Sequence, residues 1–336
     1  MEYISLYVFL AAVCFWMVTI NKPALCGVEK IQKNANSLRG IFAIFIIFTH
    51  CTLAFQQLSV FLLPLRKVST FGVGFFFVLS GYGLALSFEK KENYLNGFIV
   101  KKVILKIALA AVICRIISMI LSVLILKKSV LTTVSKFFVG INWYIYAMCI
   151  LYIIFYFVYK YIKNAQLRLI CLWVAVISCT LLARQFDLSR SYYISEWAFP
   201  FGATLYEKKN DIDKTMKEHA LAVSFFMIIL LGLSFVIAIK AQEGTIVDLI
   251  SHNIMLLPFY YFIMVMCKYM TFSNSVLNFL NKISFEIYLY QFIILEIGKT
   301  YLPSFNIFYF IFTTVFTIIL AYAVYTVPKM IKNQTK

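Results

Sequence analysis

The chain is dominated by apolar segments, each about as long as a bilayer is thick, which alternate with short loops rich in Lys and Arg. A transmembrane helix needs about 20 predominantly apolar residues to cross a hydrocarbon core of roughly 30 Å. This pattern predicts an all-α fold, a polytopic integral membrane protein with about 11 transmembrane helices. We place these helices at residues 1–20, 39–57, 70–88, 103–125, 139–159, 166–183, 191–206, 219–239, 246–267, 276–298 and 305–327.

The composition excludes a soluble domain. Of the 336 residues, 62% are hydrophobic and only 13% are charged, and the mean hydropathy is +0.88. In a soluble protein the formal net charge of +17 would suggest a nucleic-acid partner. Here the basic residues lie in short loops, where they set the membrane orientation. We therefore expect contacts with membrane lipids and no nucleic-acid partner.

The basic loops also predict the orientation and the location. If Lys22, Lys30 and Lys33 stay in the cytoplasm, eleven helices place the N-terminus outside, the C-terminus inside and most Lys and Arg residues on the cytoplasmic side. We expect a multi-pass protein of the bacterial plasma membrane. Residues 1–20 begin without a basic residue and lack a small-x-small cleavage site, which favours a retained helix over a signal peptide.

Cysteine and histidine usage limits the chemistry. The eight cysteines show no CxxC spacing and there are only three histidines, so we expect neither a disulfide framework nor a metal site. Apart from 21–38, the loops are short. We predict one transmembrane domain over 1–336, in which any chemistry takes place among the helices.

One helix carries an arginine at its mouth and a histidine inside. Ten residues separate Arg39 from His50, so the two side chains lie about 20° apart on one face and roughly 16 Å apart along the axis. If Arg39 is at a membrane surface, His50 is near the midplane. An ionisable residue at that depth indicates a functional site, and histidine moves protons near neutral pH. The alternatives are an interhelical hydrogen bond for His50 and a topogenic anchor for Arg39.

Two further helices carry polar residues at a similar depth. Ser80, counted from the end of its helix, lies near the level of His50. Ser284, Tyr288 and Gln291 share one helix face by i, i+4 and i+7 spacing. Close helix packing is the alternative role for Ser80, and ordinary interhelical hydrogen bonding is the alternative for the second group.

The order of these signals resembles the membrane-bound acyltransferase 3 family. The resemblance rests on Leu-Arg-Gly at 38–40 with the following His50, on Phe-Val-Leu-Ser-Gly at 77–81, on Trp-Tyr at 143–144, on Phe-Pro-Phe-Gly at 199–202 and on the helix 281–291. It implies an acyltransferase-like core of ten helices over 36–328. Residues 1–35 then form an extra N-terminal helix and a cytoplasmic loop.

Three features depart from the family pattern. Gln291 stands where the family helix usually ends in His, and an amide cannot shuttle a proton. The cytoplasmic Arg-x-x-Arg is represented only by lysines, which supply charge without bidentate phosphate geometry. The Glu-x-Pro that often follows the last helix is reduced to Val327 and Pro328.

The resemblance implies transfer of an acyl group, usually acetyl from cytoplasmic acetyl-CoA, to a hydroxyl of an exported or lipid-linked cell-envelope polysaccharide. Acetyl-CoA or another acyl-CoA is then the donor, and no cofactor is bound permanently. The cations expected to hold the CoA phosphates are Arg39, Lys101, Lys102 and Lys106. The expected catalytic residues are His50, as general base or in forming an acyl intermediate, and Ser80, Tyr288 and Gln291, which orient the substrate or stabilise the oxyanion.

Other intramembrane polar groups are weaker candidates. Asp248 and His252, at i and i+4 near the outer face, suit either an acceptor contact or a local pair. Arg115 needs a carboxylate or a cavity, with Glu196 and Glu286 as candidate partners.

Two other function classes remain open. One is a glycan or lipid transporter or flippase, although the sequence lacks the symmetry of two related halves that such proteins often show. The other is a non-catalytic membrane partner in polysaccharide assembly, which the replacements at Gln291 and at the lysines allow.

Overall fold

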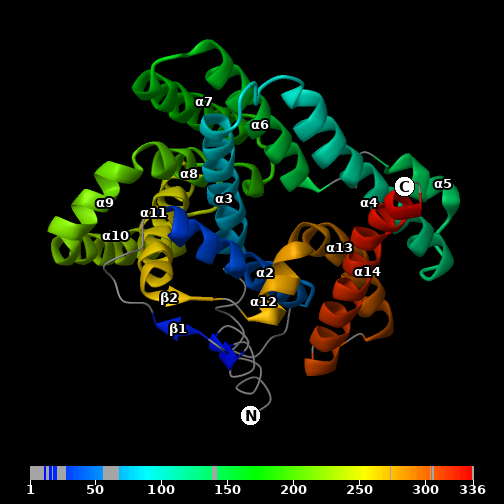
Figure 1. Cartoon of the computed structure of the whole chain (residues 1–336). Helices are drawn as coiled ribbons and strands as arrows, with labels where there is room; N and C mark the ends of the chain where they lie inside the picture. Colours follow the sequence, from blue (N-terminus) through cyan, green and yellow to red (C-terminus); the bar gives the residue numbers. More distant parts are fainter. Residues whose placement is uncertain are drawn as a thin grey trace.

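The computed structural model describes residues 11–12, 15–16, 18–20, 28–55, 68–137, 142–272, 274–302, 304 and 306–334, and this part of the chain is almost entirely helical (Figure 1). Within it, 8 helices are long and apolar enough to cross a membrane. The prediction of an all-α, multi-pass membrane protein is therefore confirmed. The elements are β1 Thr19–Ile20, α2 Val28–Leu53, α3 Val68–Lys90, the π-helix η3 Ile99–Ala108, α4 Leu109–Leu124, α5 Val130–Ser135, α6 Trp143–Tyr161, α7 Ala165–Gln185, the 3₁₀ turn η4 Arg190–Tyr192, α8 Ala198–Glu207, α9 Lys209–Glu218, α10 Ala220–Lys240, α11 Ile246–Tyr269, β2 Met270–Thr271, α12 Ser275–Lys282, α13 Ser284–Tyr301 and α14 Ile307–Gln334.

Three of the eleven predicted spans are not among these eight helices. The first, 1–20, lies mostly outside the described residues, and its end forms strand β1, which pairs with β2. The tenth, 276–298, is divided at Ile283 into α12 and α13. Helix α13 is long enough to span, but its 18 residues include three charged ones, Glu286, Glu296 and Lys299.

The seventh predicted span, 191–206, is helical only in its second half. Helix α8 begins at Ala198, and Pro200 lies in its first turn, where the missing N–H is tolerated. The segment before it consists of the turn η4 and irregular backbone. The prediction of a helix over the whole of 191–206 is therefore wrong for its first half.

Ion pairs at both ends show that this segment nevertheless runs the length of the bundle. At its start, Arg190 pairs with Asp248 in the first turn of α11 at 2.7 Å. At its end, Glu207 pairs with Arg168 in the first turn of α7 at 2.9 Å and accepts a hydrogen bond from Tyr159 near the end of α6. The chain thus crosses from one end of the bundle to the other between 190 and 207.

Helices α2 and α3 form the centre of the bundle (Figure 1). Helix α3 is buried on all sides between Gly72 and Tyr82, and it packs backbone to backbone against α8. A Cβ atom on Gly81 would collide with the carbonyl of Phe199, and one on Gly202 would collide with that of Val78. Small residues therefore permit this contact, as they do in membrane helix pairs generally.

The outer helices expose their apolar side chains. On α10, for example, Phe225 is 67% exposed and Leu233 is 60% exposed. Side chains of this kind also cover the outer faces of α4, α7 and α14. An apolar exterior around a buried centre is the arrangement expected for helices that face lipid.

Candidate functional site

His50 lies in the last turn of α2 and faces Gln291 near the middle of α13. Its Nδ1 atom is 3.1 Å from the amide oxygen Oε1 of Gln291. The amide orientation is fixed because Gln291 Nε2 donates to the carbonyl of Tyr288 at 3.1 Å. Since the amide oxygen can only accept, Nδ1 carries the ring proton. In the neutral ring the lone pair is then on Nε2, as a general base requires.

The surroundings of this pair leave the imidazole accessible. Gln291 is fully buried, whereas His50 is only partly buried. The Phe292 ring lies beside the imidazole, with a centroid distance of 4.7 Å. None of the described residues forms a hydrogen bond with His50 Nε2. The ring is thus held on one side and free to meet a substrate on the other.

Tyr288 extends this hydrogen-bonded group toward the start of α6. Its hydroxyl donates to Asn142 Oδ1 at 3.3 Å. The same oxygen caps α6 by accepting from the backbone N–H of Tyr144. The Asn142 amide is therefore fixed through its oxygen, while its Nδ2 donor is buried and has no hydrogen-bond partner among the residues that the structure describes. Such a donor is available to a bound molecule.

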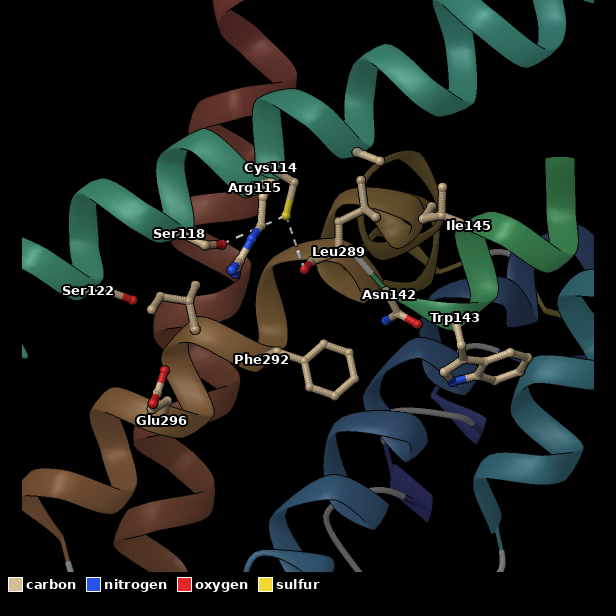
Figure 2. A pocket seen from close by; sticks show the side chains of 12 residues that line it. Cys114, Arg115, Ser118, Ser122, Asn142, Trp143, Ile145, Leu289, Phe292 and Glu296 are labelled. Carbon is tan, nitrogen blue, oxygen red and sulfur yellow. Dashed lines mark hydrogen bonds between the residues drawn. The ribbon is translucent and has the colours of Figure 1, made fainter. Parts of the chain in front are cut away.

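A cavity of about 360 Å³ lies beside these residues, between α4, the start of α6 and α13. Figure 2 shows Phe292 in its centre, Glu296 on one side, and Asn142 and Trp143 on the other. Phe292 also contacts His50, so the cavity adjoins the histidine. Its other polar lining residues are Cys114, Arg115, Ser118 and Ser122. The cavity therefore offers hydrogen-bond donors, acceptors and an indole ring together.

Arg115 contributes its guanidinium to this cavity from α4 (Figure 2). Its Nε donates to the carbonyl of Phe137 at 3.0 Å, and a terminal nitrogen donates to that of Lys136 at 2.9 Å. Backbone carbonyls and a cavity, and not Glu196 or Glu286, thus accommodate this arginine. Across the cavity, Glu296 forms an ion pair with Lys128.

Arg39 lies eleven residues before His50 on the same continuous helix, as the spacing predicted. Its guanidinium carbon lies 5.8 Å from the centre of the Phe76 ring, and no residue in the described part of the chain forms a hydrogen bond with its buried Nε atom. Phe76, Tyr144 and Tyr288 form an aromatic cluster, with ring centroids 4.5 to 6.4 Å apart. This aromatic cluster separates Arg39 from Asn142 and His50.

The three predicted phosphate-binding lysines all lie on the π-helix η3. Lys106 is within electrostatic reach of both Lys102 and Arg39. Lys102 lies over the Tyr94 ring, with its Nζ 5.7 Å from the ring centre. Lys101 is exposed beside Gly97. The structure therefore brings Lys102 and Lys106 toward Arg39, but not Lys101.

Ser80 lies in the buried part of α3 and not against His50. Its hydroxyl lies instead on the side of Tyr152 on α6. Ser284, the first member of the predicted stripe on α13, donates to the carbonyl of Asn281. Of the predicted catalytic residues, the structure thus joins His50, Gln291 and Tyr288 and leaves Ser80 apart.

Asp248 and His252 form a local network with Arg190. Two guanidinium nitrogens of Arg190 donate to the Asp248 carboxylate at 2.7 and 2.8 Å. A terminal nitrogen also lies 2.9 Å from His252 Nε2. The backbone N–H of Gly244 donates to the same carboxylate. Of the two roles considered for Asp248 and His252, this geometry favours the local pair.

Apart from Arg115, the sequence analysis did not predict the polar residues that line the cavity. Asn142 precedes a run of apolar residues and is a typical helix N-cap, so its position was recognisable but its unused donor was not. Trp143 entered only as part of the family resemblance. Ser118, Ser122 and Glu296 lie on apolar helices without any spacing signal that links them.

Comparison with known proteins identifies a family for this chain. The model of the acyltransferase 3 family, described as an acyltransferase domain, matches residues 33–326. A search of curated proteins found no match, and a search of solved structures found none either. Because the matched region covers most of the 336 residues, the chain belongs to the acyltransferase 3 family.

Proposed function

We propose that this acyltransferase transfers an acetyl group from cytoplasmic acetyl-CoA to a hydroxyl of an exported or lipid-linked cell-envelope polysaccharide. It acts in the bacterial plasma membrane, with its N-terminus outside and its C-terminus in the cytoplasm. The observation that carries the proposal is the 3.1 Å contact between His50 and Gln291, which leaves Nε2 of a partly exposed histidine as a proton acceptor beside a polar cavity.

In the proposed step, His50 Nε2 removes the proton of the acceptor hydroxyl while its oxygen attacks the thioester carbonyl. The tetrahedral intermediate then collapses, and the carbon–sulfur bond breaks. The departing sulfur takes the proton back from the imidazolium, so CoA leaves as a thiol and the histidine returns to its neutral form. Throughout the step, the Gln291 side chain accepts the hydrogen bond from the Nδ1–H group of His50, so Gln291 acts as a positioning residue.

The donor enters from the cytoplasmic side in this proposal. Arg39, Lys102 and Lys106 are near enough to act together on the anionic part of acyl-CoA, and Lys101 adds charge at the surface. Acyl-CoA is a substrate here, so no permanently bound cofactor is required. The aromatic cluster of Phe76, Tyr144 and Tyr288 separates Arg39 from His50, so its rings must part for the thioester to reach the histidine.

The acceptor occupies the cavity lined by Asn142, Trp143 and Glu296. A sugar presents hydroxyls that both donate and accept, together with C–H faces that pack on aromatic rings. The unpaired Asn142 Nδ2, the Glu296 carboxylate and the Trp143 indole match these three features. The Asn142 donor is also placed to stabilise an oxyanion.

Tyr288 and Ser80 act through other residues. The Tyr288 hydroxyl holds the Asn142 amide, and Ser80 lies beside Tyr152. We assign to both a positioning role, because neither hydroxyl contacts His50.

Mass spectrometry of envelope glycans from cells with and without the gene tests this function. The expected result is an acyl ester on one glycan that requires the gene and is released by mild alkali. Loss of the whole glycan from the surface, with its acyl groups intact on the intracellular material, would support a transporter instead. Thioester-dependent transfer by the purified protein would exclude a non-catalytic partner.

A further inference from the structure

A second, larger cleft lies at the end of the bundle where α3, α6 and α7 meet. It has a volume of about 990 Å³ and is lined by the loop that follows α3 and the loop between α6 and α7. Lys90 and Lys91 line it where α3 ends and the following loop begins, and Lys160 and Lys163 line it where α6 ends and the next loop begins. These lysines were assigned only to membrane orientation in the sequence analysis.

The charge of this cleft is positive because its basic lining residues outnumber the acidic ones, and one of the acidic ones is neutralised from outside. Glu89 pairs with Lys209 at 3.3 Å. Within the described residues, no carboxylate forms an ion pair with Lys91, Lys160 or Lys163. Glu92 remains as an acidic lining residue against these lysines and Lys90. The cleft therefore suits a ligand that carries several negative charges.

Aromatic rings line the same cleft. Tyr94 lies in the loop that follows α3, and the Lys102 ammonium lies over its ring. The hydroxyl of Tyr156 accepts a hydrogen bond from Lys160 at 3.0 Å. Burial raises the pKa of the Tyr94 phenol, so it remains neutral and does not repel an anion. Tyrosine rings stack well on nucleobases.

A series of cations connects this cleft to the candidate site. Lys91, at the cleft, is within electrostatic reach of Lys102. Lys102 is within reach of Lys106, and Lys106 is within reach of Arg39. A ligand with several phosphates and a long uncharged arm can therefore lie with its terminal phosphate in the cleft, its other phosphates beside Lys102 and Lys106, and its arm beyond them.

We propose that this cleft binds the adenosine 3′-phosphate end of acyl-CoA, with the 3′-phosphate on Lys90, Lys91, Lys160 and Lys163 and the adenine on Tyr94 or Tyr156, while the diphosphate meets Lys102 and Lys106. This inference rests on the proposed function, because it takes acyl-CoA as the donor. The rings and the size of the cleft favour a nucleotide over the phosphate of a lipid headgroup, which needs no aromatic platform.

The test is equilibrium binding of CoA and of 3′-dephospho-CoA to the full-length protein in phosphatidylcholine nanodiscs. The variant is K160E/K163E, which reverses the charge of two exposed lysines, one in the last turn of α6 and one in the loop that follows it. The matched control is K214E/K217E, which makes the same charge change at two exposed lysines of α9 outside the cleft. Repeating the titrations with phosphatidylglycerol in the nanodiscs separates nucleotide binding from lipid binding.

We expect K160E/K163E to weaken CoA binding by about tenfold or more, since charge-assisted phosphate contacts are lost. The control should bind as the wild type does. The wild type should prefer CoA over 3′-dephospho-CoA, and the variant should lose that preference.

Unchanged CoA binding by K160E/K163E, with normal binding by the wild type, would overturn the cleft assignment alone. No CoA binding by the wild type would overturn the cleft and the acyl-CoA donor together. If phosphatidylglycerol abolishes the difference between variant and wild type, the cleft binds lipid headgroups and the nucleotide assignment is wrong.

Discussion

The His50 imidazole donates its Nδ1 proton to the Gln291 side chain, and the Gln291 amide is in turn fixed by the carbonyl of Tyr288. The Gln291 amide therefore sets the tautomer and the ring orientation of the histidine. This role requires a hydrogen-bond acceptor and not a group that transfers protons. Replacement of the family's usual His by Gln is thus compatible with catalysis by His50.

Gln291→Met should test this positioning role, because Met keeps the volume but cannot accept the hydrogen bond. Loss of one such bond is worth about 1 kcal/mol and often more when a catalytic geometry depends on it. We expect kcat for acyl transfer to fall by about tenfold or more while KM for acetyl-CoA is unchanged. The measurement is steady-state kinetics in nanodiscs. An equal rise in KM with normal kcat would contradict a positioning role.

Gly81→Ala should destabilise the contact between α3 and α8, since its Cβ would meet the carbonyl of Phe199. Overpacking of this kind costs about 1–3 kcal/mol. We expect less folded protein in the membrane and a lower melting temperature in detergent. Gly83→Ala is the matched control on the same helix, because no atom lies within 4 Å of its added Cβ. Similar behaviour of the two variants would contradict the packing described for α3.

Ser118→Trp should fill the cavity beside His50 with an indole. We expect acylated envelope glycan to disappear from cells while the purified variant still binds CoA, because the donor route lies on the other side of the aromatic cluster. The control is Ser135→Trp on the exposed face of α5. Normal glycan acylation in Ser118→Trp cells would show that the acceptor binds elsewhere.

The orientation predicts which loops face the cytoplasm. A cysteine at exposed Ser135 should react with a membrane-impermeant maleimide in intact cells, and one at exposed Lys163 should react only after the membrane is opened. The positive-inside distribution gives the physical reason. The reverse labelling pattern would place the C-terminus outside and would move the proposed donor cleft to the wrong side of the membrane.

The residues that the sequence analysis placed correctly are those whose position follows from helix geometry. Arg39 and His50 lie on one continuous helix, and the 3.6-residue repeat alone relates them. Tyr288 and Gln291 share a face of α13 for the same reason. The contact of His50 with Gln291, 241 residues apart, was not predicted, because periodicity within a helix says nothing about its neighbours.

Other features depend on tertiary structure and could not be predicted. The irregular first half of the seventh span is stabilised by the pairing of Arg190 with Asp248, a contact between distant segments. The cavity of Asn142 and Glu296 is formed by three separate elements, none of which has an unusual sequence pattern. The π-helix η3, which carries Lys102 and Lys106, could not be predicted either, because its residue spacing does not distinguish it from an α-helix.

The central claim is that His50 is the proton acceptor in acyl transfer. It is tested most directly by release of CoA thiol from acetyl-CoA and formation of glycan acyl ester by the purified protein in nanodiscs. His50→Ala should abolish both, while His219→Ala, which removes a histidine that is largely exposed at 67%, should retain both. Wild-type rates in His50→Ala protein that is folded and membrane-inserted would contradict the account.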